Sequence, residues 1–318
     1  MAPARAPDRI ARAFAVASIA LAVQVASAAA EHAPAVDVDA FWEYSDPAAS
    51  EARFRAALNG ASADTALELQ TQIARTFSLR KRFAEAHQVL DSIAPELAQA
   101  GATPRVRALL ERGRTFNSSG DRERAAALFG DAWDLAVENR LDGLAVDAAH
   151  MLAIARQGDE AALWTRRGLE LARPSSDSKA RALMPALLNN HASNLHDAGS
   201  YGDALPIFRE AEAAWHATGR QPQGRIATWS VARCLRSLGR YDDALAMQRA
   251  LEAQWRDAGQ VDGYVFEEIA ELLDAQGRSD EARPYFARAA AELEKDPSFA
   301  KNESARLARL RERARGAS

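Results

Sequence analysis

The chain has 318 residues, of which 48% are hydrophobic, and its 40 Lys and Arg against 44 Asp and Glu give a formal net charge of −4. This acidic balance argues against a general nucleic-acid binder, which normally carries a basic face. Cys234 is the only cysteine, so no intramolecular disulfide can form and packing alone must stabilise the fold.

The N-terminus has the pattern of a secretory signal. Three arginines lie within the first twelve residues, an apolar run follows over 13–25, and small residues come next. An apolar run of about 13 residues is too short to span a bilayer, and this order of segments is typical of signal peptides. We predict a signal peptide at 1–30, cleaved before Ala29 or Glu31, and a periplasmic or secreted protein without membrane association after cleavage. An uncleaved membrane anchor is the alternative.

Residues 31–65 are predicted to form a lead-in to the main domain. A short helix from Ala48 to Leu58 is expected to cover the first repeat of the region that follows.

A short sequence recurs along the rest of the chain. It consists of Gly, a variable pair, an acidic or polar residue, and Ala with a large apolar residue four positions later, as in GSYGDALPIF (199–208) and GRSDEARPYF (277–286). Recurrence at a period of about 40 residues is the signature of a repeat architecture, in which each unit packs on its neighbours. The anchoring alanines are Ala86, Ala125, Ala161, Ala204, Ala244 and Ala282.

Two apolar stripes flank each glycine. The stripe that begins at the alanine follows i, i+4, i+7 and i+11, as from Ala204 to Trp215, and therefore predicts one face of a helix. A second stripe precedes the glycine, as from Phe266 to Leu273. Each unit is therefore predicted to be a helix pair joined by a tight glycine turn.

This pattern resembles the tetratricopeptide repeat. That family places a small residue in the first helix, a Gly turn, Ala early in the second helix, an aromatic four later and Ala three after that. Gly199, Ala204, Phe208 and Ala211 match in that order. The resemblance covers 66–296. The period is longer than the usual one of about 34 residues, and is similar to that of kinesin light chain and of the bacterial maltose-regulon activator.

The resemblance implies an all-α fold, an α-solenoid of about six helix pairs in a right-handed superhelix. The unit around Ala161 fits least well, because Thr165 and Gly168 stand where the aromatic and the alanine are expected. The arginine-rich segment 297–318 is predicted to be a C-terminal capping helix with a solvated basic face.

In tetratricopeptide repeats the first helix of each pair lines a concave groove that binds peptides. Residues at the corresponding positions give this acidic chain a locally basic, amide-rich groove, which we expect to bind a protein or peptide with acidic or C-terminal carboxylate groups. The alternative is a set of solvated helix faces with ion pairs between helices. The predicted groove residues are Arg75, Arg114, Asn117, His150, Asn189, His196, Trp229, Arg233 and Arg236.

Motifs for catalysis are missing from the sequence. It contains no P-loop, no dinucleotide-binding glycine motif, no H-E-x-x-H and no paired-cysteine zinc spacing, so we predict no enzyme activity, no cofactor and no metal. Asp147 and His150, at i and i+3 on a helix, can pair and would anchor an unrecognised active site with Asn189 and Asn190. The leading prediction is an exported protein-interaction module, with an envelope assembly subunit that uses its outer surface as the rival.

Overall fold

The computed structural model describes residues 36–316, so the predicted signal peptide lies outside the described residues. Within this range the chain is all-helical, as predicted, with seventeen α-helices and one 3-10 helix. It forms two compact units, one ending at Asn194 and the other beginning at Leu195. No helix in this part of the chain is long and apolar enough to cross a membrane.

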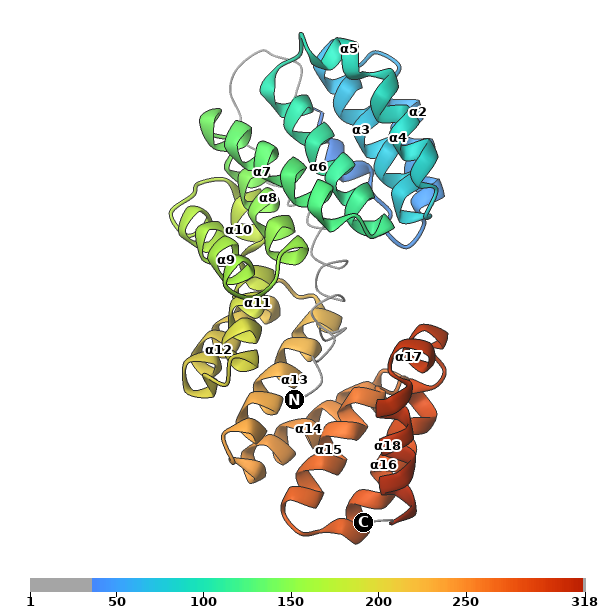
Figure 1. Ribbon diagram of the computed structural model, residues 1–318, viewed down its shortest axis with the longest axis vertical. Helices are drawn as coiled ribbons and strands as arrows, with labels where there is room; N and C mark the ends of the chain where they lie inside the picture. The colour runs from blue at the N-terminus through green and yellow to red at the C-terminus, as the bar shows by residue number, and fades with distance from the viewer. Residues whose placement is uncertain (1–35, 317–318) are drawn as a thin grey trace. The chain divides into compact units, whose positions relative to one another are not determined.

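Unit 1 contains three complete helix pairs, α3–α4, α6–α7 and α8–α9, whose members pack against each other. Helices α6 and α8 also pack on the preceding pair, as α6 does on α3 (Figure 1). The elements of unit 1 are η1 (Val38–Phe41), α2 (Pro47–Ala57), α3 (Ala63–Leu79), α4 (Phe83–Ser92), α5 (Ala94–Leu97), α6 (Ala102–Ser119), α7 (Arg122–Glu138), α8 (Asp142–Ala155), α9 (Gly158–Ala172), α10 (Ser178–Ala182) and most of α11 (Met184–Asp197).

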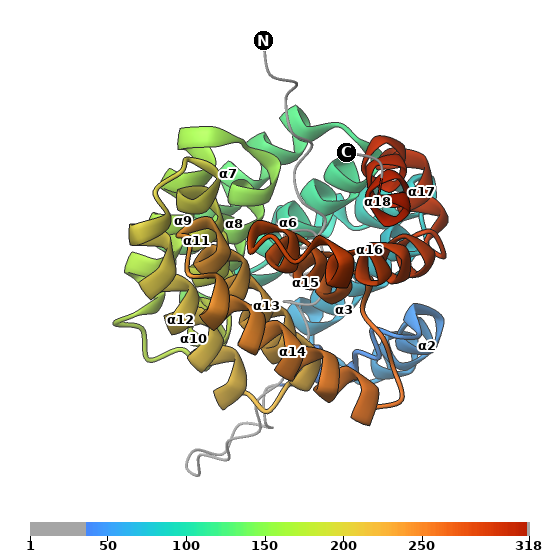
Figure 2. The same cartoon turned by 90° about the horizontal axis from the view of Figure 1, so that it is seen from below.

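Unit 2 continues the same order of helices. Helices α15, α16 and α18 lie side by side, as Figure 2 shows. Its elements are the end of α11, then α12 (Tyr201–Ala217), α13 (Gln221–Ser237), α14 (Tyr241–Asp257), α15 (Gly263–Ala275), α16 (Ser279–Leu293), α17 (Pro297–Asn302) and α18 (Ser304–Arg315). The members of α13–α14 and of α15–α16 pack against each other. Helices α11 and α12 follow one another in the same order along the chain, so the described residues have the helix order of the predicted solenoid.

The anchoring alanines lie at the helix contacts that the repeat pattern predicts. Each of the six is at most 5% exposed. The reason for small residues is clearest where α6 meets α7: a Cβ at Gly113 would lie 2.5 Å from the ring of Phe129, which is fully buried. A larger side chain in the first helix would therefore push the aromatic ring out of the contact.

The unit around Ala161 is a regular helix pair in spite of its poor match. Thr165 is fully buried and its hydroxyl donates a hydrogen bond to the carbonyl of Ala161, so its polar group is satisfied inside the helix. At Gly168, an added Cβ would lie 3.0 Å from Leu187 on α11. Close packing therefore replaces the usual aromatic and alanine in this pair.

The C-terminal segment ends in a cap, as predicted, but it consists of two helices. Helix α18 packs on α16, with Leu307 and Leu310 buried. Arg306 of α18 forms an ion pair with Glu267 of α15, 39 residues earlier in the chain. This separation is one repeat, so α18 takes the place of the first helix of a further pair, and part of its basic face is paired.

Candidate functional site

Three successive first helices of unit 1 present equivalent positions on one surface. Helix α3 contributes positions i, i+4 and i+7 of one face, and α6 and α8 repeat this arrangement 39 and 75 residues later. We call this surface the helix A face of unit 1. It comprises Glu68, Gln72 and Arg75 of α3, Arg107, Glu111 and Arg114 of α6, and Gly143, Asp147 and His150 of α8.

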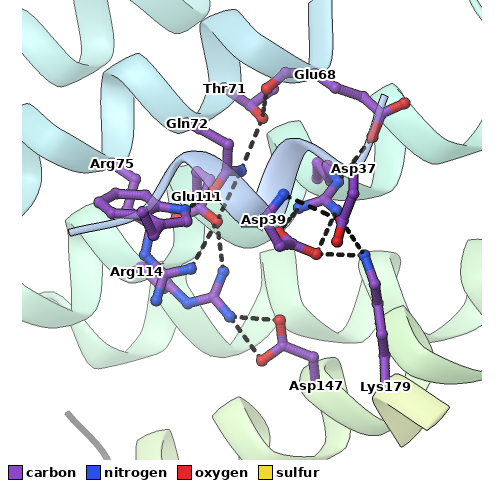
Figure 3. Close-up of polar contacts among 12 residues, drawn as sticks. Asp37, Asp39, Glu68, Thr71, Gln72, Arg75, Glu111, Arg114, Asp147 and Lys179 are labelled. Carbon is purple, nitrogen blue, oxygen red and sulfur yellow. Dashed lines mark hydrogen bonds and ion pairs between the residues drawn. The ribbon is translucent and has the colours of Figure 1, made fainter. Parts of the chain in front are cut away.

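Ion pairs between neighbouring helices cross this face (Figure 3). Arg114 donates to Glu111 Oε1 at 2.7 Å and to the two carboxylate oxygens of Asp147 at 2.6 and 2.5 Å. Burial alone would raise the pKa of Asp147, but the Arg114 guanidinium lowers it below its usual range. Arg75 also donates to Glu111, at 3.4 Å. The predicted groove residues Arg75 and Arg114 are thus 6% and 7% exposed and are paired within the fold.

His150 lies at the base of the helix A face and is fully buried. The predicted pair with Asp147 does not form, since neither ring nitrogen of His150 has a hydrogen-bond partner among the described residues, and Asp147 is held by Arg114. Burial lowers the pKa of His150 to about 4; Asp147 raises it and Arg114 lowers it to a smaller extent. The imidazole is therefore neutral at pH 7. Within the described residues, Asp147 and His150 are not hydrogen-bonded to each other and so do not form an acid–base pair.

The buried His150 predicts a specific pH dependence of stability. Its folded pKa lies below the ordinary value of 6.5, so between about pH 6.5 and 4 the unfolded chain takes up a proton that the folded chain excludes. Acidification over this window should lower the free energy of unfolding by up to about 3 kcal/mol through this group. Urea titrations of the wild type and His150→Leu at pH 7 and pH 4.5 measure the effect. Equal losses of stability in the two proteins would contradict it.

A segment that precedes the repeats occupies the helix A face of unit 1. We call residues 36–44 the strap. Arg107 donates to the two oxygens of Asp39 at 3.1 Å each, and Lys179 of α10 donates to Asp39 and, at 3.1 Å, to Asp37 (Figure 3). Burial would raise the pKa of Asp39, but Arg107 and Lys179 lower it strongly. The face thus holds a carboxylate, clamped by two cations, Arg107 and Lys179, that are not among the predicted groove residues.

Aromatic residues attach the strap to α3 and α2. Trp42 Nε1 donates to Gln72 Oε1 at 3.1 Å, and Trp42 stacks on Tyr44 with ring centroids 4.7 Å apart. The guanidinium of Arg75 lies 5.3 Å from the Trp42 ring centroid and 5.7 Å from that of Tyr44. Burial raises the pKa of Tyr44 to about 12. Arg75 therefore contacts the strap through cation–π geometry.

The strap leaves part of the face uncovered. A cavity of 580 Å³ lies between the strap and helices α3, α6, α8 and α10. Its lining combines apolar side chains with charged ones, a composition suited to binding part of a peptide. The apolar lining includes Leu110, Leu141, Leu144 and Leu183, and the charged lining includes Arg75, Glu111 and Asp147.

The two remaining predicted residues of unit 1 lie away from this arrangement of ion pairs. Asn117 is half-buried in the last turn of α6. Asn189, on α11, is 1% exposed, and its Oδ1 has no hydrogen-bond partner among the described residues. Neither residue lines the cavity.

The predicted groove residues of unit 2 form a separate set. His196 contacts Ser237 Oγ at 2.9 Å, and Trp229 donates to the carbonyl of Tyr264 at 3.3 Å. The Arg233 guanidinium lies 5.7 Å from the Trp229 ring centroid. Arg236 donates to both oxygens of Glu268, at 2.8 and 2.9 Å. As in unit 1, the contacts of His196, Trp229 and Arg236 with Ser237, Tyr264 and Glu268 join neighbouring first helices, whereas the Arg233–Trp229 contact lies within α13.

No group of three or more His, Cys, Asp or Glu side chains among residues 36–316 is arranged to hold a metal ion. Cys234 is buried, and burial raises the pKa of its thiol to about 11, so it is not a reactive thiolate at neutral pH.

Comparison with known proteins supports the repeat architecture. Residues 183–257 match the tetratricopeptide repeat family. No curated protein matches the sequence. Among solved structures, NprR in complex with its cognate peptide NprX is similar at 14% identity, with a TM-score of 0.54 over 85% of this chain and 79% of that one.

Two further structures show the same likeness. The apo form of RapI has 13% identity and a TM-score of 0.62, over 78% of this chain and 71% of that one. A Rap protein complexed with Competence and Sporulation Factor has 15% identity and a TM-score of 0.50, over 84% and 81%. At these identities the likeness concerns the fold alone, and the described chain has the fold of helical-repeat proteins. Residues 183–257 in addition carry the sequence of the tetratricopeptide repeat.

Proposed function

We propose that this protein is a binding module that holds an extended peptide or protein segment on the helix A face of unit 1 and catalyses no reaction itself. The observation that carries the proposal is the strap. A non-repeat segment already lies on this face, with its carboxylate clamped by Arg107 and Lys179 and its indole bonded to Gln72. The fold is compatible with this role, since the similar NprR structure contains a cognate peptide.

We further propose that the protein works outside the cytoplasm, in the periplasm or as a secreted protein. The basic, apolar and small-residue segments of the first thirty residues support export. The long repeat period, which resembles that of kinesin light chain and the maltose-regulon activator, accords with a role in protein contacts.

The proposed function predicts that partner capture depends on the helix A face. Purified protein should retain a partner from an envelope extract, and Arg107→Gln with Lys179→Ala should reduce the retained amount about tenfold or more, because the two cations that grip a carboxylate are lost. Retention should also fall as salt is raised, since exposed charges are screened. Quantitative mass spectrometry of the retained proteins provides the measurement.

Arg249→Gln serves as the matched control, since this arginine is exposed on α14, a second helix. Equal retention by the control and the helix A variant would contradict the proposal. Loss in the control alone would instead favour an assembly subunit that uses its outer surface. That rival is supported by Val137 and Leu163, which are 45% and 38% exposed on α7 and α9.

A further inference from the structure

We infer that the strap is a resident ligand of the helix A face of unit 1, and that the face recognises partner segments with the same chemistry: a carboxylate followed three residues later by an aromatic residue, as in Asp39 and Trp42. Binding then requires the partner to displace the strap. This inference rests on the proposed peptide-binding function and adds the class of ligand and the competition that regulates it.

The carboxylate position is the most defined part of the site. Arg107 uses two nitrogens for Asp39 and a third for Glu68 Oε2, at 2.9 Å. Within the described chain, the ion pairs of Lys179 are with Asp37 and Asp39. Release of the strap would therefore leave Lys179 unpaired and Arg107 with one carboxylate. An incoming carboxylate would restore the same two-pronged contact, which is specific to planar acids.

The aromatic position lies three residues further along the strap, where Trp42 contacts α3 and α2. Trp42 has an amide acceptor in Gln72, a guanidinium face in Arg75 and an edge-to-face partner in Phe54, whose ring centroid is 5.0 Å away. Phe54 is fully buried beneath the strap. A segment without an aromatic residue would leave this ring exposed, so displacement requires an apolar replacement as well as a charge.

The contacts of the strap are consistent with exchange. Its outer residues are open to solvent, with Val36 46% exposed, and it belongs to none of the helix pairs. The adjoining 580 Å³ cavity gives an incoming segment room to bind beside the strap before replacing it. Since the strap is covalently attached, it competes at high effective concentration. The apparent affinity for a partner therefore equals the intrinsic affinity multiplied by the fraction of chains whose face is vacant.

A synthetic peptide of residues 36–46, VDVDAFWEYSD with blocked ends and a fluorescent label, tests the inference by fluorescence polarisation. The full chain with Asp39→Asn and Trp42→Ala should bind this peptide at least about tenfold more tightly than the wild type, because the mutated strap no longer competes. Adding Arg107→Gln to that double variant should weaken its binding of the peptide about tenfold, because the main cation of the carboxylate position is lost. The same peptide with Asn and Ala at the two key positions should not bind.

Asp39→Asn alone keeps the shape of the side chain and serves as the test if the double variant loses its helical circular dichroism. The affinity of this single variant for the peptide should lie between that of the wild type and that of the double variant. Equal affinity of wild type and folded strap variants for the peptide would overturn the inference. If those variants nevertheless retain partners from the envelope extract, the proposed function stands and only the ligand class fails. Peptide-sensitive dimers of the wild type would show instead that straps exchange between two copies, and would also overturn it.

Discussion

Arg114→Ala is expected to lower the free energy of unfolding by about 3–5 kcal/mol, since the substitution leaves the largely buried Asp147 without its ion-pair partner and Glu111 with only the longer ion pair to Arg75. Glu111 and Asp147 both depend on this guanidinium, and their side chains are 2% and 17% exposed. Burial opposes the charge of Arg114, but the two carboxylates raise its pKa above the usual arginine value. The native state therefore contains the charged form at any accessible pH.

Arg112→Ala on the same helix is the matched control. Arg112 pairs with Asp91 at the surface, where the two side chains are 27% and 67% exposed. Exposed pairs contribute about 0–1 kcal/mol, so its loss should be small. Urea unfolding followed by circular dichroism measures both variants at pH 7. If Arg114→Ala costs no more than Arg112→Ala, the carboxylates have found other partners and the buried ion pairs of this face do not stabilise it.

The sequence predicted the helix pairs because burial of small and apolar residues follows the helical period. Ala86, Ala125 and Ala244 are each fully buried, as their place in the repeat requires. Packing between neighbours repeats with the sequence, so one well-matched unit identifies the others. Even the weak unit around Ala161 forms a helix pair, because Thr165 can satisfy its hydroxyl within its own helix.

The partners of the charged residues were harder to predict. The sequence placed Arg75 and Arg114 on the inner helices, but not their ion pairs with carboxylates of adjacent helices. A usable signal exists in the spacing: Glu68 precedes Arg107, and Glu267 precedes Arg306, by 39 residues, which is one repeat. Residues of opposite charge at equivalent positions of successive first helices face each other and form ion pairs. A charged residue with such a counterpart one repeat away is therefore expected to be paired within the fold, before a ligand-binding role is considered for it.

The strap could not be predicted from local patterns. Asp39 and Lys179 are 140 residues apart, and nothing in either neighbourhood marks them as partners. Residues 31–65 were expected only to supply a helix over the first repeat, and α2 is that helix, with its Phe54 buried. The contact depends on how three helix pairs curve around the segment, which follows from the tertiary structure.

Leu235→Ala and Leu273→Ala in unit 2 are each expected to lower the free energy of unfolding by about 2–5 kcal/mol, because a large side chain is removed from a closed core. Leu235 is 1% exposed and Leu273 is fully buried, each in the first helix of a pair. The cost is the sum of two parts. The first is the free energy gained by burying the leucine side chain away from water, which is lost, and the second is the cost of the cavity that the side chain leaves. Both positions lie in the second stripe that the repeat pattern predicts.

Leu195 occupies the equivalent place in α11 but is only half-buried, so Leu195→Ala should cost clearly less than either substitution. Chemical denaturation of the three variants under identical conditions tests this order. Because a repeat array can unfold in parts, hydrogen exchange of α13 and α15 should accompany the measurement and show which pairs lose protection. Near-neutral values at both Leu235 and Leu273 would contradict the burial of the second stripe in the cores of these two helix pairs.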